Sequence, residues 1–289
     1  MPPQDPEPLA NPDDLIHLWH YTNPAAIIGI CETRTLLAGY PLDMNDRREQ
    51  HVAPDHCISY LTSQGRRASN FLEQWVEYRA GTPGTSWHRA PFIISFTAAR
   101  DSLVHWMTYA NAYGGMGIGF TQAHLVEAGR LQPYGSFELH KVLYNESAQR
   151  ALCDELTEKA LTNYEEAQLD GTREAHGFIA RFDAEVARLG STMKDPAFEI
   201  EQEWRLVSPV LGMWPTEAMA FRPSARGIRE YVKFDIWAGH PEGEPRPGIA
   251  FNLGPNGDTH ANYRATEGLA NKLGLTEIGW EQSTSPYRN

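Results

Sequence analysis

Short stretches in which apolar and polar residues alternate, or which are apolar throughout, predict the strands of this chain. The segment 90–97 is the clearest of them, because it is short, apolar and rich in β-forming residues. The segment 35–46 is expected to be an extended piece that runs into a polar loop, and 114–121 a glycine-rich turn that enters a strand. Further strands are expected at 15–22, 137–144, 198–210 and 229–236, after Gly248 and near the C-terminus.

Helical spacing of apolar residues predicts the elements between these strands. Asn23 is placed to cap a short helix that begins with Pro24, Asp101 to cap a second helix, and Gly129 to end a third. The apolar faces expected in the segments 66–80 and 101–112 are Phe71, Leu72, Trp75 and Tyr78 in the first and Leu103, Trp106, Met107, Tyr109 and Ala110 in the second.

The order of these elements predicts an α+β fold. Two long helical stretches at about 146–193, separated by the sequence LDGT, are expected to form a helical insertion. Residues 1–13 are rich in proline and polar side chains and are expected to be a flexible tail. No linker divides the rest convincingly, so we expect a single α+β domain over residues 14–289.

Composition narrows the class of protein. The net charge of −12 lowers the expectation of a constitutive binder of duplex DNA, which usually has a basic face. Cys31, Cys57 and Cys153 fit no disulfide framework and indicate a reducing compartment. The N-terminal segment has no signal-peptide pattern, and no apolar stretch approaches the roughly 18 residues of a membrane span. We therefore expect a cytoplasmic protein without a membrane partner.

Several common catalytic motifs are missing from the sequence. There is no phosphate-binding GxxxxGK[ST] loop and no GxSxG elbow, and GGMGIGF does not fit a dinucleotide-binding GxGxxG turn. His51, His56 and Cys57 lie close together in the chain but lack a second ligand pair, so we expect no metal site. Ser95, at the end of a predicted buried strand, remains a candidate supporting group.

A charged face is predicted for the segment 198–207. In an extended strand, alternate side chains point the same way, which places Glu199, Glu201, Glu203 and Arg205 on one face and Phe198, Ile200, Trp204 and Leu206 on the core face. Carboxylates two residues apart repel each other, so a protein tolerates them at a solvated surface or at a site that uses them. The pattern alone leaves both interpretations open.

Two other segments offer polar groups that suit a ligand. In the sequence WHYT, a strand places His20 and Thr22 on one face and Tyr21 with Trp19 on the other. His20 and Thr22 could bind a ribose or a phosphate, although a lone His is more often satisfied in the core. The loop NDRRE, with Asn45 and Asp46, could position a ligand or be a solvated turn.

These motifs, in their order and spacing, resemble a bacterial family known as domain of unknown function 2971. The resemblance rests on WHYT, on MND with a Glu three residues after the Asp, and on ISF. It also rests on W-x-x-Y at Trp106 and Tyr109, on G-x-G-F, on the segment from Lys194 to Val207 that ends in EWRLV, and on a closing SPYR. Arg47 departs from the NDP that is more usual in the family. The match extends over nearly the whole chain.

A weaker resemblance is to ADP-ribosyltransferase-fold enzymes of the toxin and RNA 2′-phosphotransferase branch. It implies a split β-sheet core, NAD as substrate, and a toxin or phage-defence role with an antitoxin or immunity protein as partner. It implies that His20 and Thr22 hold the ribose of NAD, and that Glu203, with Glu201 as its companion, stabilises the positive charge formed as nicotinamide leaves. The other residues that it implies at the NAD site are Tyr21, Asn45, Asp46, Ser95, Trp106 or Tyr109 as the stacking aromatic, and Arg205.

The activity expected from this resemblance is transfer of ADP-ribose from NAD to an acceptor, either a nucleic acid or a protein. Two alternatives stay open. One is an enzyme that hydrolyses NAD or removes a 2′-phosphate from RNA. The other is a non-catalytic module that binds a nucleotide or a partner.

Overall fold

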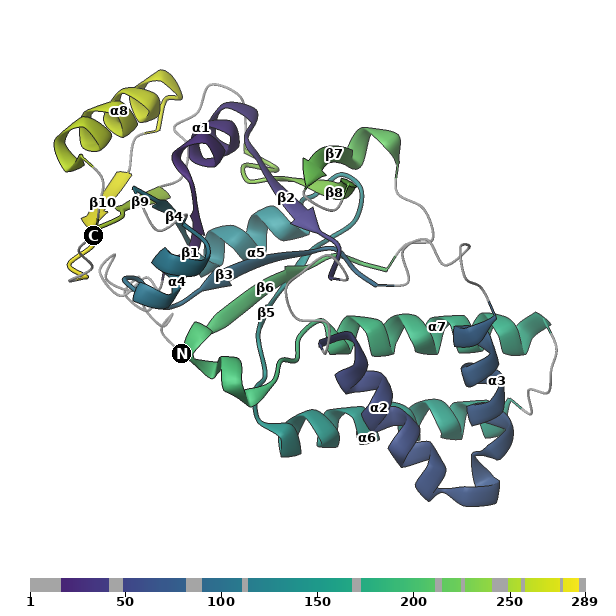
Figure 1. Cartoon of the computed structure of the whole chain (residues 1–289). Coiled ribbons are helices and arrows are strands. Elements are labelled where there is room, and N and C mark those ends of the chain that lie inside the picture. Colours follow the sequence, from purple (N-terminus) through teal and green to yellow (C-terminus); the bar gives the residue numbers. More distant parts are fainter. Residues whose placement is uncertain are drawn as a thin grey trace, which may run out of the picture. The chain divides into compact units, whose positions relative to one another are not determined.

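The structure of the chain is a computed structural model (Figure 1). It describes residues 17–41, 49–81, 90–110, 114–167, 173–210, 215–224, 227–240, 249–255, 258–275 and 278–285. The predicted tail at residues 1–13 lies outside these ranges, as do Asn45 and Asp46. The chain divides into two compact units. The first is made of residues 1–32, 96–127 and 240–289, and the second of residues 33–95 and 128–239.

The first unit is built on four strands. In spatial order they are β10 (Ile278–Gln282), β9 (Ile249–Leu253), β4 (Met116–Thr121) and β1 (His17–Thr22). The β1–β4 and β4–β9 pairs are antiparallel, and β9–β10 is parallel. The helices of this unit are α1 (Pro24–Thr33), α4 (Leu103–Thr108), most of α5 (Gln122–Arg130) and α8 (Thr259–Lys272).

The helix ends of this unit confirm one prediction and correct another. The Asn23 side chain accepts a hydrogen bond from the Ala26 amide at 2.9 Å, so it caps α1 as expected. Asp101 does not cap α4, because Ser102 holds that position. The Asp101 carboxylate instead accepts hydrogen bonds from Trp106 Nε1 at 2.7 Å and Ser283 Oγ at 2.6 Å. These bonds connect α4 to Ser283, the residue that directly follows β10.

The second unit contains the remaining strands. These are β2 (Thr35–Gly39), most of β3 (Ile93–Thr97), β5 (Glu138–Lys141), β6 (Glu203–Val207), β7 (Met219–Ser224) and β8 (Gly227–Asp235). Their order is β3-β2-β8-β7, and β6 pairs with both β3 and β5. Strand β7 was not predicted. Every described strand pair in this unit whose register is known is antiparallel. The described strands and helices together make an α+β protein, as predicted.

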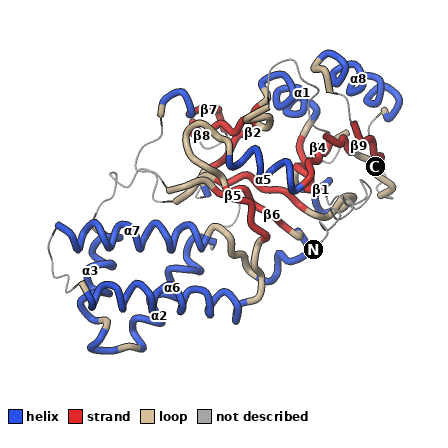
Figure 2. Tube along the Cα trace, turned by 180° about the vertical axis from the view of Figure 1, so that it is seen from behind, coloured by secondary structure: helices blue, strands red, loops and turns tan. Residues whose placement is uncertain are grey.

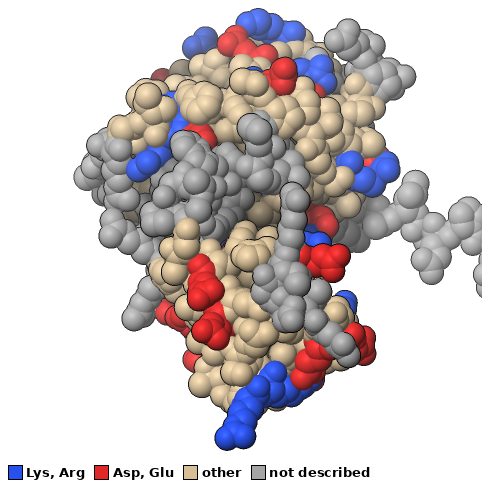
Figure 3. All heavy atoms as spheres, turned by 90° about the vertical axis from the view of Figure 1, so that its right-hand side faces the viewer, with Lys and Arg blue, Asp and Glu red and all other residues tan. Residues whose placement is uncertain are grey.

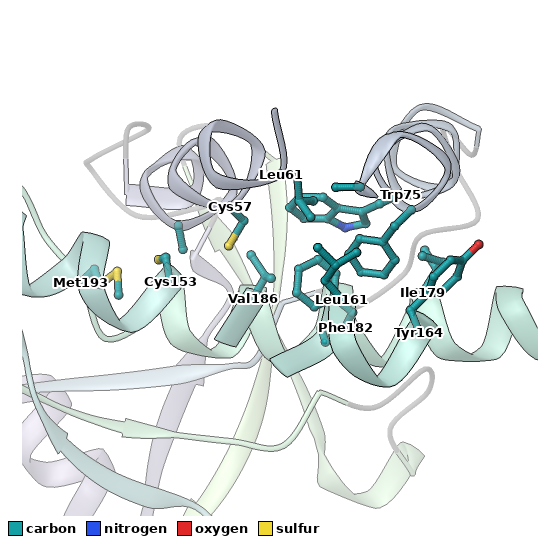
Figure 4. Close-up of a cluster of buried hydrophobic side chains, with 14 residues drawn as sticks. Cys57, Leu61, Trp75, Cys153, Leu161, Tyr164, Ile179, Phe182, Val186 and Met193 are labelled. Carbon is teal, nitrogen blue, oxygen red and sulfur yellow. The ribbon is translucent and has the colours of Figure 1, made fainter. Parts of the chain in front are cut away.

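Four long helices pack together in the second unit. They are α2 (Glu49–Ser63), α3 (Ser69–Ala80), α6 (Glu146–Glu166) and α7 (Arg173–Gly190), and α6 and α7 run side by side in Figure 2. Their shared core includes Cys57, Trp75, Leu161 and Phe182 (Figure 4). The predicted helical hairpin α6–α7 therefore packs against two helices from residues 49–80, α2 and α3. The helix α2 was not predicted.

The polar groups of this helical core are also paired. The Trp75 indole donates to Asp183 at 2.9 Å, and Arg79 contacts the same oxygen at 2.6 Å.

On the face shown in Figure 3, both acidic and basic side chains lie at the described surface. None of the described helices is long and apolar enough to cross a membrane.

Candidate functional site

Five charged side chains are buried together in the second unit. They are Glu49, Lys194, Glu201, Glu203 and Arg205, and their side chains are between 1% and 11% exposed. Burying a charge costs several kcal/mol unless it is paired and hydrogen-bonded. A group of three carboxyls and two cations is therefore unusual for a core, and it is the candidate site of this protein.

A sharp turn in the backbone brings Glu201 and Glu203 to the same place. Glu201 ends a 3-10 helix, η4 (Pro196–Glu201), and Glu203 begins β6. Gln202 between them has φ 45° and ψ 45°, a left-handed conformation that costs a non-glycine residue about 1 kcal/mol or more. Because of this turn, both carboxylates contact the ammonium group of Lys194.

This geometry corrects the predicted strand over 198–210. Only residues 203–207 form a strand, because η4 occupies the residues before it. Ile200, assigned to the core face, is 63% exposed, whereas Glu203 and Arg205 are buried. The sequence pattern left open that these charged residues lie on a solvated surface. That interpretation is wrong for Glu201, Glu203 and Arg205, which are buried. Their ion pairs with one another and with Lys194 allow them to be buried.

Arg205 binds two carboxylates at once. Its Nε lies 2.8 Å from Glu203 Oε1 and its Nη2 lies 2.9 Å from Glu203 Oε2. The same Nη2 lies 2.9 Å from Glu49 Oε2, and Nη1 donates to the Ser191 carbonyl at 2.9 Å. A planar guanidinium suits such paired contacts, so Arg205 fixes the orientation of Glu203.

Lys194 contacts all three carboxylates. Its Nζ lies 2.5 Å from Glu201, 3.1 Å from Glu203 and 3.3 Å from Glu49. The backbone of Lys194 is held by Leu143 and Gln149, since the Lys194 amide donates to the Leu143 carbonyl and Gln149 Nε2 donates to the Lys194 carbonyl. The ammonium group is therefore presented from a fixed piece of backbone between α7 and η4.

The environment shifts the pKa values of Glu203 and Glu49 in opposite directions. Burial alone would raise the pKa of Glu203, but Arg205, Lys194 and the neighbouring Ser95 outweigh it and lower the pKa to about 2. Burial raises the pKa of Glu49, although Arg205 and Lys194 oppose it. Burial would lower the pKa values of Lys194 and Arg205. The surrounding carboxylates outweigh this effect and raise both pKa values. Glu203 is therefore ionised at neutral pH.

Two neutral groups support the start of β6. Tyr144 accepts a hydrogen bond from the Glu203 amide through its hydroxyl oxygen at 2.8 Å. Burial raises the pKa of Tyr144 to about 12, so the hydroxyl stays protonated. Ser95, on β3, lies close enough to the Glu203 carboxylate to help lower its pKa. The predicted residues Ser95, Glu201, Glu203 and Arg205 are therefore brought together in one place.

Glu49 and Lys194 are the members of this cluster that the sequence analysis assigned no role. Both belong to quoted motifs: Glu49 is the Glu three residues after Asp46, and Lys194 opens the segment that ends in EWRLV. A count of charges in that segment would have been a usable signal, because its acidic residues outnumber its basic ones and need cations if they are buried.

The other predicted residues lie in the first unit. His20 and Thr22 are half-buried on β1, and the His20 ring packs edge-on against Phe96 with centroids 5.9 Å apart. The Tyr21 hydroxyl donates to the carbonyls of Ala99 and Arg100 at 3.0 and 2.6 Å. Whether His20, Ser95 and Glu203 share a cleft stays a prediction, since Ser95 and Glu203 belong to the second unit.

The two aromatic candidates differ in accessibility. Trp106 is 2% exposed, packs against Tyr21 at 4.5 Å between ring centroids, and donates its indole N–H to Asp101. Tyr109 is 40% exposed. A ligand ring can therefore reach Tyr109 but not the face of Trp106 in this conformation. Leu103 and Met107, predicted on the same apolar face, are also exposed, because only Trp106 and Ala110 of that face enter the core.

A metal-binding group does not occur among the described residues: no three His, Cys, Asp or Glu side chains are arranged to hold an ion. Cys57 lies in the helical core beside Cys153 (Figure 4), while His51 is exposed. The charged cluster instead holds one carboxylate, Glu203, ionised and in a fixed orientation.

A search of curated proteins found no match to this chain, and neither did a search of solved structures. A family model described as Protein of unknown function (DUF2971) matches residues 105–206. The matched segment contains Trp106 and Tyr109 of the first unit, and Lys194, Glu201, Glu203 and Arg205 of the buried cluster. Over this segment the chain resembles that family, as its motifs predicted.

Proposed function

We propose that the chain is an NAD-dependent ADP-ribosyltransferase with an ADP-ribosyltransferase-like core, acting as a toxin or in defence on a nucleic acid or protein acceptor. The observation that carries the proposal is the state of Glu203. Its carboxylate is buried, oriented by Arg205 through two hydrogen bonds, and held ionised with a pKa of about 2. A partner antitoxin or immunity protein follows from the same proposal.

A fixed carboxylate suits the cleavage of an N-glycosidic bond. Positive charge develops on C1′ of the ribose as nicotinamide leaves, and an oriented anion stabilises that charge more in the transition state than in the ground state. Glu203 and Glu201 supply this negative charge in the proposal. Lys194 contacts both, so a positively charged substrate group would compete with its ammonium for the same oxygens.

Binding of the rest of NAD is assigned by resemblance. His20 and Thr22 are proposed to hold its ribose, and Tyr109, the accessible aromatic, to stack on nicotinamide. Asn45, Asp46 and Arg205 complete the assignment. NAD hydrolysis and RNA 2′-phosphate transfer are variants of the same proposal that differ in the acceptor.

A second candidate is supported by a different observation. Both oxygens of Glu203 already contact a cation, and Glu203 as a whole residue is 5% exposed. A carboxylate so occupied also suits a purely structural cluster. In that case the protein is a non-catalytic module that binds a nucleotide or a partner.

The proposal is tested by incubating the purified protein with NAD and measuring the release of nicotinamide by chromatography. Glu203→Gln is expected to lower the release by about 100-fold or more, because the positive charge that develops on the ribose in the transition state loses the carboxylate that stabilises it. Glu199→Gln is the matched control, because Glu199 is an exposed carboxylate of the same 3-10 helix.

Three results decide among the candidates. Release by the wild type but not by Glu203→Gln supports the enzyme, provided that the variant retains its circular-dichroism spectrum. Equal release by both proteins removes Glu203 from the mechanism. No release from NAD, together with NAD binding that His20→Ala abolishes, supports the binding module. Transfer of label from NAD to protein or nucleic acid separates transfer from hydrolysis.

A further inference from the structure

Strand β8 of the second unit has a buried face and an open face. It lies between β2 and β7 (Figure 1), and its alternate residues point to opposite faces of the sheet. Val232 and Phe234 are buried on one face. Arg229, Tyr231 and Lys233 therefore point to the other face, where the first two are half-buried and the third is exposed.

A fourth residue extends this row onto the neighbouring strand. Arg222 of β7 lies directly opposite Arg229, so both guanidinium groups belong to the same face, and Arg222 is exposed. Like charges directly opposite each other disfavour strand pairing, and an anion bound to both relieves the repulsion. We call Arg222, Arg229, Tyr231 and Lys233 the basic strip.

Tyr231 is the aromatic member of the basic strip. Its direct neighbours across the strands are Gly39 of β2 and Ala220 of β7. A Cβ on Gly39 would lie 3.6 Å from Tyr231 Cε1, so the ring lies alongside the backbone of β2. Because both neighbours are small, the ring is only half-buried and offers part of its π surface to a flat ligand.

Two acidic residues of β8 accompany the basic strip. Glu230 points to the opposite face of the strand, and Asp235, which follows on the face of the strip, lies 3.9 Å from Arg34. Lys233 donates one of its three N–H groups to the Glu217 carbonyl at 3.1 Å. The strip thus brings three cations to one face of a chain whose net charge is −12.

The face that carries the basic strip continues toward the charged cluster. Gly39 pairs directly with Tyr231 on β8 and with Ile93 on β3, so all three point to one face. Ser95, two residues after Ile93, points the same way and lies close to the Glu203 carboxylate. Two strand spacings separate β8 from β3, a distance of about 10 Å. A chain bound across the strip therefore runs toward Ser95.

We propose that the basic strip binds single-stranded nucleic acid through its three cations, which contact phosphates, and through Tyr231, on which a base stacks. Cations that alternate with an aromatic ring on an open sheet face suit an unpaired strand, whose bases are free to stack. A duplex hides its bases and is usually bound by a broader basic face. Only the use of the bound strand as the acceptor of ADP-ribose rests on the proposed function.

The test is fluorescence anisotropy of the purified full chain with a labelled oligonucleotide of about 12 nucleotides, offered as single-stranded RNA, as single-stranded DNA and as a duplex. The single strands are expected to bind, and the duplex to bind about 10-fold more weakly because it offers no free base. Three phosphate contacts predict a slope of about −2 when the logarithm of the binding constant is plotted against that of the salt concentration.

Matched variants assign the binding to the basic strip. Tyr231→Ala is expected to weaken binding about 10-fold, and Tyr231→Phe, which keeps the ring, to bind as the wild type does. Arg222→Gln should weaken binding and make the salt slope less negative by about 0.7. Arg66→Gln is the control, because Arg66 is exposed on the 3-10 helix η3 (Gly65–Arg67) and its loss changes the net charge equally. Arg222 is exposed, so its variant keeps the test open if Tyr231→Ala does not fold.

Several results would overturn the inference. They are no binding of either single strand at low salt, a duplex that binds as tightly as the single strands, and equal weakening by Arg222→Gln and Arg66→Gln. Displacement of the oligonucleotide by an equal concentration of polyglutamate would instead assign the strip to an acidic protein.

The binding measurement contains no NAD, so the inference and the proposed function fail separately. Release of nicotinamide without binding of an oligonucleotide would contradict the inference alone. Binding of an oligonucleotide without release of nicotinamide would contradict the proposed function alone.

Discussion

Arg205 binds Glu203 through two parallel hydrogen bonds although only one residue separates them along β6. The pairs are Nε to Oε1 at 2.8 Å and Nη2 to Oε2 at 2.9 Å. Residues two apart on a strand face the same way, which allows this local fork. The Arg205 side chain is 1% exposed, so the pair works in a medium that screens it far less than water does.

The first prediction concerns the geometry of that fork. Arg205→Lys keeps the charge but cannot make both contacts with Glu203 and still reach Glu49 and Ser191. We expect the free energy of unfolding, measured with urea, to fall by about 2–4 kcal/mol, since buried partners lose their bonds. Arg188→Lys is the control. Arg188 pairs with Glu138 at the surface, where the change should be about 0–1 kcal/mol.

The second prediction is a dependence of stability on acid pH. A carboxyl whose pKa is lowered by folding stabilises the protein above its ordinary pKa, and this is lost as the pH falls through the lowered value. For Glu203 the window runs from about 4.5 down to about 2 and corresponds to on the order of 3 kcal/mol. Glu203→Gln should lower stability at neutral pH and approach the wild type below this window.

Urea unfolding at a series of pH values measures the difference between the two proteins. A constant difference across the window would show that Glu203 does not titrate there. Glu199→Gln, an exposed change in the adjoining 3-10 helix, should follow the wild type at every pH.

A third prediction uses the left-handed turn at Gln202. The side chain is exposed, so substitutions there act through the backbone. Asparagine tolerates this conformation and a β-branched residue does not. Gln202→Asn should be neutral within about 0.5 kcal/mol, and Gln202→Val should destabilise by about 1–2 kcal/mol. Equal unfolding free energies for the two variants would mean that the turn adjusts without cost.

The fourth prediction compares two glycines of the first unit. A Cβ at Gly119 would lie 2.8 Å from the ring of Trp19, which is fully buried and cannot move aside. Gly119→Ala should therefore destabilise by about 1–3 kcal/mol. Gly29, inside α1, has nothing within 4 Å of the same position. Gly29→Ala should stabilise by about 0.5–1 kcal/mol, because alanine is the better helix former. Thermal unfolding distinguishes the two variants.

Local pattern predicted most of the described elements. The alternation in 15–22 and the apolar run in 90–97 contain β1 and β3, and the Asn23-Pro24 pair gives the start of α1. The helix α2 was missed, since Pro54 interrupts its pattern of apolar residues. Strand β7 was missed because most of its residues are exposed and one is a proline.

The sequence by itself determined the residue types of the cluster, the strand that carries Glu203 and Arg205, and the α+β class. These follow from periods of 2 and 3.6 residues, which depend only on neighbours in the chain. Tertiary structure alone decided that Glu201, Glu203 and Arg205 of the charged face are buried. It brings Glu49 to Arg205 across 156 positions of the chain and Lys194 to three carboxylates. The energy of a buried charge depends on which opposite charges surround it, and that arrangement exists only when the chain is folded.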